Sequence, residues 1–141
     1  MGNPDGFRDT VQPMLAQALQ QAGLKPSMAP AIAAQMALET GYGRSVLGNN
    51  LGNIKADKSW NGATVTNPGV TSESNVFRSY ANPQDAINDY VRFIVSNPRY
   101  APALSSKNPA EFFSALQSAG YATDKDYAQK LAGTFSKLYP G

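Results

Sequence analysis

The segment AQMALETGYGRS, residues 34–45, ends an alanine-rich helix at two glycines and places one carboxylate, Glu39, in the last helical turn. We predict that this helix follows a cap at Ser27, accommodates Pro30 in its first turn and ends near Thr40, because glycine favours the left-handed conformation that ends helices. The helix macrodipole disfavours a negative charge at this end and favours a protonated acid. Glu39 is therefore either a solvated surface residue or a carboxylate directed into a cleft.

Composition narrows the functional classes that fit the chain. With 141 residues it is long enough for a hydrophobic core, and we expect one domain over residues 1–141. The sequence contains no Cys and no His, which excludes disulfides, a thiolate nucleophile, a Ser-His-Asp triad and most catalytic metal sites. We therefore expect no metal and no cofactor. An enzyme of this composition has to work with carboxylates, Tyr, Lys, Arg or hydroxyl groups.

The charge and hydropathy of the sequence indicate whether nucleic acid or a membrane is an expected partner. The net charge is +2 and the cations are scattered, so we expect no nucleic-acid partner. No apolar run approaches the ~20 residues of a membrane span, and we expect no membrane insertion. The first ten residues lack the apolar region of a secretory signal.

Helix starts are marked by local capping patterns. NPQD at residues 82–85 and NPAE at 108–111 each predict an Asn cap, Pro at the first helical position and an acid at the third. TDKD at 123–126 predicts a Thr cap in the same way. Apolar stripes follow these caps, and an earlier stripe from Phe7 to Leu19 predicts a helix that Pro13 kinks or splits.

Residues 48–80 differ from the helical segments because they are rich in Gly, Asn, Thr and Ser. ATVT at 63–66 and SNVFRSY at 74–80 predict a short irregular β-hairpin. The expected order is two or three helices, a small β region and three further helices. This order favours a mostly α, α+β fold in which a helical lobe and a β-hairpin lobe flank a cleft.

Most acidic residues have a structural explanation. Asp85, Glu111, Asp124 and Asp126 belong to helix starts, and Asp89 is expected on the exposed side of its helix. Glu39 and Glu73 remain, one at a helix end and one in the β region. A pair of carboxylates on opposite sides of a cleft is the arrangement of glycosidases. Asp57 competes with Glu73 for the second position.

Aromatic residues near loops and helix ends are candidates for sugar binding, because sugars present apolar faces and hydroxylated edges. The alternative is ordinary packing. The candidate substrate-binding residues are Tyr42, Asn50, Asp57, Trp60, Tyr80 and Tyr127, and Tyr100 and Tyr121 share the same kind of position.

Four segments in order resemble glycoside hydrolase family seventy-three, the β-N-acetylglucosaminidases of bacterial autolysins, flagellar peptidoglycan hydrolases and some phage lysins. They are AQMALETGYGRS (34–45), NNLGNIKADKSWNG (49–62), FRSYANPQDAINDYVRFIVSNPRYA (77–101) and AGYATDKDYAQKL (119–131). The resemblance covers the chain from about Gln35 to Leu138. It implies a lysozyme-like fold with a glycan groove, and cleavage of the β-1,4 bond after N-acetylglucosamine in peptidoglycan.

The resemblance also implies residue roles. Glu39 matches the family's general acid, Glu73 falls where members carry a second carboxylate, and Tyr121 matches a tyrosine that faces the scissile sugar. The expected catalytic set is therefore Glu39, Glu73 and Tyr121, with Asn50 helping to orient the sugar. Two departures from the family pattern are NNLGNIK, which lacks an aromatic residue that many members carry, and GYG in place of the commoner GWG.

The sequence is compatible with several other functions and mechanisms. A muramidase or lytic transglycosylase on the same fold would cut the other glycosidic bond, and a non-catalytic domain would only bind peptidoglycan. The second half of the reaction uses Glu73, Asp57 or the substrate's own N-acetyl group. We expect a monomer that acts in the bacterial periplasm or cell wall, delivered by a phage, by flagellar export or by an injection system, or belonging to a longer protein.

Overall fold

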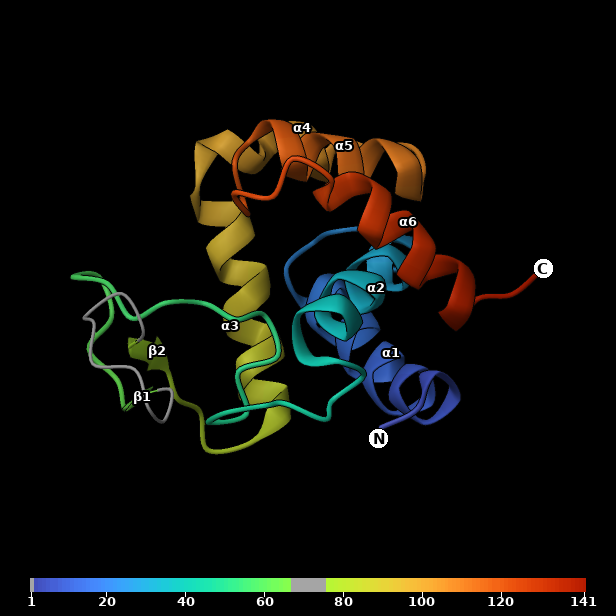
Figure 1. Cartoon of the computed structure of the whole chain (residues 1–141). Coiled ribbons are helices and arrows are strands. Elements are labelled where there is room, and N and C mark those ends of the chain that lie inside the picture. The colour runs from blue at the N-terminus through green and yellow to red at the C-terminus, as the bar shows by residue number, and fades with distance from the viewer. Residues whose placement is uncertain (1, 67–75) are drawn as a thin grey trace.

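Helices make up most of the computed structural model, which describes residues 2–66 and 76–141 (Figure 1). The α-helices are α1 (Pro4–Gln21), α2 (Ala29–Thr40), α3 (Pro83–Ser96), α4 (Ala101–Leu104), α5 (Pro109–Ser118) and α6 (Tyr127–Leu138), with 3-10 turns η1 (Pro26–Met28) and η3 (Pro98–Tyr100). An antiparallel pair of strands, β1 (Thr64–Thr66) and β2 (Val76–Arg78), forms the sheet. The predicted mostly α, α+β class is confirmed, whereas the short α4 was not predicted.

Asn-Pro pairs start three of the helices. The side chains of Asn82 and Asn108 accept the backbone N–H of Asp85 and Glu111 at 2.9 Å, as the sequence predicts. Asn3 caps α1 in the same way through the Gly6 N–H at 2.7 Å, a cap that we did not predict. Each bond satisfies a backbone donor that has no partner within the helix.

Two other predicted caps are wrong. Ser27 lies in η1, and the cap position of α2 is Met28, with no side-chain cap bond. Thr123 does not cap α6, because the Asp124 carboxylate accepts the Asp126 N–H and forms a turn that delays the helix to Tyr127. In both cases a tight turn precedes the helix. The same capping residues can start a turn or a helix, so the sequence pattern by itself does not show which of these structures forms.

Pro13 does not split α1, which is continuous from Pro4 to Gln21. The missing Pro13 N–H leaves the Asp9 carbonyl without its helical partner, but Pro13 and Asp9 are both exposed, so water can bond to that carbonyl.

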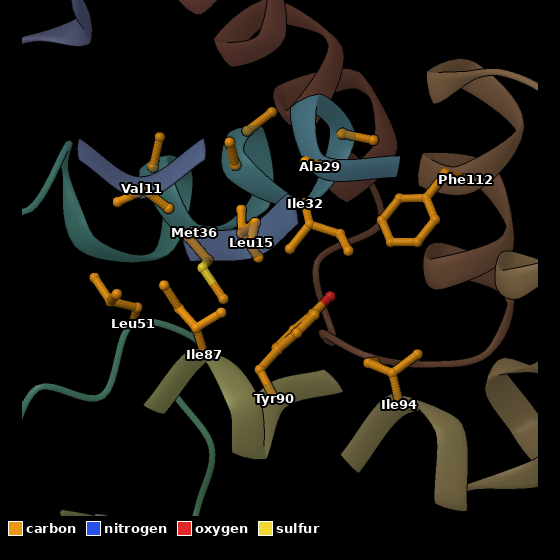
Figure 2. Packing of buried hydrophobic residues seen from close by; sticks show 14 of the residues in the cluster. Val11, Leu15, Ala29, Ile32, Met36, Leu51, Ile87, Tyr90, Ile94 and Phe112 are labelled. Atoms are coloured by element: carbon orange, nitrogen blue, oxygen red, sulfur yellow. The ribbon is translucent and has the colours of Figure 1, made fainter. Parts of the chain in front are cut away.

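Helix α2 forms the centre of the core and packs against α1, α5 and α6. Nearly all its residues from Ala29 to Ala37 are buried, which is the behaviour expected of a helix that is apolar on all sides. Figure 2 shows Ile87 and Tyr90 of α3 pointing toward Met36 and Ile32 of α2. Each fully buried Leu, Ile or Phe contributes about 1.5–3 kcal/mol of hydrophobic stabilisation, and this packing fixes the position of the α2 C-terminus.

The two strands lie beside α3, apart from α1 and the C-terminal end of α6 (Figure 1). Val65 pairs with Phe77, and β2 also bonds to the loop that follows α2 through the Arg78 N–H and the Ile54 carbonyl at 3.1 Å. The loop and the strands therefore form one unit next to the end of α2. Within the described residues, no helix is long and apolar enough to cross a membrane.

Candidate active site

Glu39 lies in the last turn of α2, and local contacts fix that turn. Gly41 ends the helix in the left-handed conformation with φ of 59°. The buried Thr40 hydroxyl donates to the Met36 carbonyl at 2.7 Å and accepts the Gly43 N–H at 3.0 Å. Glu39 itself is half-buried. The predicted helix end is confirmed. The contacts of Gly41 and Thr40 hold the last turn of α2, and with it the Glu39 backbone, in one position.

Each carboxylate oxygen of Glu39 has a hydrogen-bond donor from a different part of the chain. The Tyr127 hydroxyl donates to Oε1 at 2.9 Å, and the Asn53 amide donates to Oε2 at 3.2 Å. Burial and the neighbouring Glu39 charge raise the pKa of Tyr127, so its hydroxyl keeps its proton and remains a donor. Asn53 reaches Glu39 from a left-handed backbone conformation with φ of 54°, which Asn tolerates better than most residues.

A cleft of about 540 Å³ opens beside Glu39, a size typical of small-molecule sites. Its lining combines the end of α2, the following loop and β2, and consists of Glu39, Arg44, Ser45, Val46, Leu47, Asn50, Asn53 and Phe77. A larger hollow of about 730 Å³ lies between α1 and the C-terminal residues. Its Arg8 and Asp9 side chains pair with each other at 3.0 Å, so we place the chemistry in the Glu39 cleft.

Tyr121 lies behind Tyr127 rather than against Glu39. Its hydroxyl donates to the Gly52 carbonyl at 2.8 Å, and its ring stacks on Tyr127 with centroids 6.2 Å apart and an interplanar angle of 6°. Burial raises the pKa of Tyr121. The family resemblance implied a catalytic role for Tyr121, and Tyr127 was predicted only to bind substrate, but it is Tyr127 that contacts the carboxylate in the structure. Tyr121 supports the Tyr127 ring and the loop at Gly52.

Asn50 lines the cleft, but backbone groups occupy its amide. Its Nδ2 donates to the carbonyls of Ile54 at 2.8 Å and Arg78 at 2.9 Å, and its Oδ1 accepts the Ile54 N–H at 3.0 Å. Both amide protons are used, so the structure gives Asn50 the role of joining the loop to β2 rather than of orienting a sugar.

Trp60 and Tyr80 form an aromatic group under the β region, with ring centroids 5.5 Å apart. The Arg78 guanidinium lies 4.9 Å from the centre of the Trp60 ring, and the indole N–H donates to the Ala63 carbonyl at 2.8 Å. The Tyr80 hydroxyl donates to Asp89 at 2.5 Å. Of these two candidate sugar-binding residues, Tyr80 therefore bonds the β region to α3, and Trp60 packs within the β region.

Asp89 contradicts the prediction that it is exposed. It is 7% exposed, and its carboxylate pairs with Arg78, itself 6% exposed, at 2.9 Å. The apolar stripe of α3 gave no sign of this, because the partner comes from β2.

Asp57 has a local structural role. Its carboxylate accepts the N–H and the hydroxyl of Ser59, and its Oδ1 lies 3.6 Å from Arg78 Nη2. The Ser59 hydrogen bonds lower the pKa of Asp57, so it is ionised at neutral pH.

Tyr42 and Glu73 complete the predicted residues. Tyr42 follows the end of α2 with φ of 60° and packs edge-on against Phe7 of α1, with centroids 6.5 Å apart. Glu73 lies outside the described residues. No group of three or more acidic, His or Cys side chains suited to a metal occurs in residues 2–66 and 76–141.

Asn53, Arg44 and Phe77 also line the cleft, and no sequence pattern had marked them as site residues. A loop asparagine next to glycine, as in LGNIK, is common in turns, so the sequence gave no separate sign that Asn53 contacts the carboxylate.

Comparison with known proteins places this geometry in a family. A family model described as mannosyl-glycoprotein endo-beta-N-acetylglucosaminidase matches residues 12–140. Peptidoglycan hydrolase FlgJ of Vibrio parahaemolyticus is 41% identical over 150 residues, a match that covers 96% of this chain and 48% of the relative. FlgJ of Pseudomonas aeruginosa is 39% identical over 143 residues, covering 91% of this chain and 35% of the relative. The chain thus spans about half, or less, of the length of these curated relatives.

Solved structures agree with the sequence matches. The crystal structure of a peptidoglycan hydrolase from Sphingomonas sp. A1 has a TM-score of 0.80 at 37% identity, covering 93% of this chain and 86% of that one. The glycoside hydrolase domain of Salmonella typhimurium FlgJ has a TM-score of 0.78 at 31% identity, covering 96% of this chain and 88% of that one. The family match spans nearly the whole chain and includes Glu39 and Tyr127. We conclude that this chain belongs to the glucosaminidase family, glycoside hydrolase family seventy-three, which its sequence motifs resemble.

Proposed function

We propose that this protein hydrolyses the β-1,4 bond between N-acetylglucosamine and N-acetylmuramic acid in the glycan strands of bacterial peptidoglycan. The observation that carries the proposal is Glu39, a half-buried carboxylate on the cleft wall with a hydrogen-bond donor at each oxygen. Relatives that match almost the whole chain are named peptidoglycan hydrolases, which supports this choice of substrate.

The geometry suits Glu39 to the role of general acid. Because Tyr127 donates to Oε1, the acidic proton belongs on Oε2, the oxygen next to Asn53. In the proposed reaction this proton moves to the glycosidic oxygen as the bond to the anomeric carbon breaks, and the leaving sugar departs as an alcohol. Water then adds to the anomeric carbon and loses a proton to a base. The base is a second carboxylate, or the substrate's N-acetyl group assists the step.

For the second carboxylate we favour Glu73 over Asp57, because the Asp57 carboxylate is held by Ser59 and Arg78. We expect Glu73→Gln to lower the hydrolysis rate by about 10²-fold, within the range typical of a general base. Asp57→Asn keeps an oxygen for the Ser59 N–H and should cause a much smaller loss. Initial rates on purified peptidoglycan measure both.

Glu111→Gln is the matched control for Glu73→Gln, since Glu111 lies at the start of α5 and its carboxylate bonds to the Lys107 N–H. If Asp57→Asn lowers the rate more than Glu73→Gln, the assignment is reversed. If neither variant loses activity, substrate assistance takes the role of the base.

The new reducing ends of the products test the proposed bond. Purified peptidoglycan is digested, the products are reduced with borohydride, and the terminal sugar is identified by mass spectrometry. Reduced N-acetylglucosamine is the expected result. Reduced or anhydro N-acetylmuramic ends would instead show a muramidase or a lytic transglycosylase, and binding without products would show a peptidoglycan-binding domain.

The proposed substrate places the action of this protein at the bacterial cell wall. The FlgJ relatives are longer, so delivery and any additional partners belong to the full-length context. The expectation of a monomer stays a prediction, and size-exclusion chromatography with light scattering measures it.

A further inference from the structure

Gln35 is a fully buried polar residue one helical turn before Glu39. It is 0% exposed, and the residues next to it in α2 are the buried Ala34 and Met36. Burying an amide among apolar side chains lowers stability unless its hydrogen bonds are satisfied. A residue of this kind in the middle of the core therefore calls for an explanation other than packing.

The Gln35 amide links three helices into one line of hydrogen bonds that ends at Glu39. The Tyr90 hydroxyl from α3 donates to Gln35 Oε1. Gln35 Nε2 donates to the Tyr127 hydroxyl oxygen at 3.2 Å, and the Tyr127 hydroxyl donates to Glu39 Oε1 at 2.9 Å. Tyr90, Gln35, Tyr127 and Glu39 form a chain of hydrogen bonds that we name the Tyr90–Glu39 relay.

The relay has one direction. A phenol carries a single proton, so Tyr127 donates to Glu39 only when it does not give that proton to Gln35. The NH₂ group of Gln35 faces the Tyr127 oxygen and cannot accept the proton. A reversed amide would face Tyr127 with its carbonyl and compete with Glu39 for the phenol proton. Tyr90 disfavours this reversal, because burial raises the pKa of Tyr90 so that the proton stays on its oxygen, and a reversed amide would leave that buried proton without its Oε1 acceptor.

We propose that Gln35 is a positioning residue for the glycosidase reaction, which directs the Tyr127 proton to Glu39 Oε1 and thereby leaves Oε2 to carry the acidic proton. The proposal rests on the role of Glu39 as general acid stated above. Gln35 does not touch the substrate, because it is buried beneath the helix end. Its effect should therefore fall on the catalytic step and not on glycan binding.

Gln35→Met tests whether the effect falls on catalysis and not on binding, because methionine has a similar length and lacks the amide NH₂ and carbonyl groups. We expect kcat on soluble, uncross-linked glycan strands to fall between about tenfold and a hundredfold, as when a catalytic group is misplaced, while KM stays unchanged. Gln12→Met is the matched control, since Gln12 also accepts a tyrosine hydroxyl, from Tyr139 at 2.6 Å, and lines the hollow between α1 and the C-terminal residues rather than the Glu39 cleft. A Gln35→Met variant with wild-type kcat overturns the proposal.

A double variant separates catalysis from stability. Gln35→Met leaves the buried Tyr90 hydroxyl without its acceptor and should lower Tm. Gln35→Met/Tyr90→Phe removes that hydroxyl, so we expect Tm to recover while kcat stays low. Recovery of both Tm and kcat would show that Gln35 only supports the fold.

Gln35→Glu tests the direction of the relay through the pH profile. Burial raises the pKa of the introduced carboxyl group, which in its protonated form can donate to Tyr127 as the amide does. Once ionised it accepts the Tyr127 proton instead, so activity should be lost at a lower pH than in the wild type. The titratable groups that face it are Glu39 on α2, Tyr90 on α3 and Tyr127 on α6, with Tyr121 and Tyr100 beyond them. An unchanged profile with normal activity contradicts the proposal.

Nuclear magnetic resonance tests the relay without an activity assay. The Gln35 side-chain NH₂ protons should exchange slowly with solvent, and their signals should shift in both Tyr90→Phe and Tyr127→Phe. Fast solvent exchange of the Gln35 NH₂ protons, or NH₂ signals that do not shift in Tyr127→Phe, would overturn the relay even if the enzyme is active. If the wild-type protein binds glycan without cleaving it while these signals behave as expected, the proposed function fails and the hydrogen-bonded relay stands.

Discussion

Glu39→Gln is expected to lower the rate of peptidoglycan hydrolysis by about 10²- to 10⁴-fold, the range over which general acids contribute to catalysis. The amide cannot deliver a proton to the glycosidic oxygen. Binding should persist, because the other cleft residues are unchanged. The release of new reducing ends from purified peptidoglycan measures the rate, and co-sedimentation with peptidoglycan measures binding.

The same substitution should leave the fold intact. Glutamine keeps an oxygen for the Tyr127 hydroxyl, and only the 3.2 Å contact with Asn53 is lost. Glutamine also has nearly the same size and shape as glutamate, so we expect an unchanged Tm by circular dichroism. Full turnover by Glu39→Gln would remove Glu39 from the mechanism, and loss of cooperative unfolding would show a structural role instead.

Asp89→Leu is expected to lower the free energy of unfolding by about 3–5 kcal/mol, as measured when one partner of a buried ion pair is removed. The leucine fills a similar volume, but it leaves the buried Arg78 guanidinium without its 2.9 Å partner and the Tyr80 hydroxyl without its acceptor. Urea denaturation of the variant and the wild type measures the change.

Arg78→Met/Asp89→Leu tests the cause. If the loss comes from the uncompensated buried charge, replacing both partners with apolar residues should restore much of the stability. Asp9→Asn is the control, since Asp9 pairs with Arg8 on the surface and should not change the denaturation midpoint measurably. Equal losses in the single and the double variant would show that the specific geometry of the pair holds the β region to α3, rather than charge compensation.

Local chemistry explains the parts of this protein that the sequence predicted correctly. Asn82 and Asn108 cap their helices through residues three positions away, and Gly41 ends α2 through its own backbone freedom, so a short window of sequence contains every atom involved. Glu39 stood out for a similar reason, because its place at a helix end left it without a local explanation. The family resemblance then added its expected role, and the comparisons confirmed the family.

Contacts between distant segments explain the parts that the sequence did not predict. Asp89 was expected to be exposed, because the stripe of α3 says nothing about Arg78 on β2. Tyr121 and Tyr127 occur in one short segment, and the way α6 meets the end of α2 decides which of them reaches Glu39.

The sequence by itself determined the helical class, the C-terminal end of α2, the starts of α3 and α5, and the carboxylate most suited to chemistry. Only the tertiary structure decided which groups surround that carboxylate, since Asn53 and Tyr127 lie 14 and 88 residues from it along the chain. The physical reason is range: capping and helix termination act within one turn, whereas hydrogen bonds and ion pairs in a packed interior depend on how whole helices dock against one another.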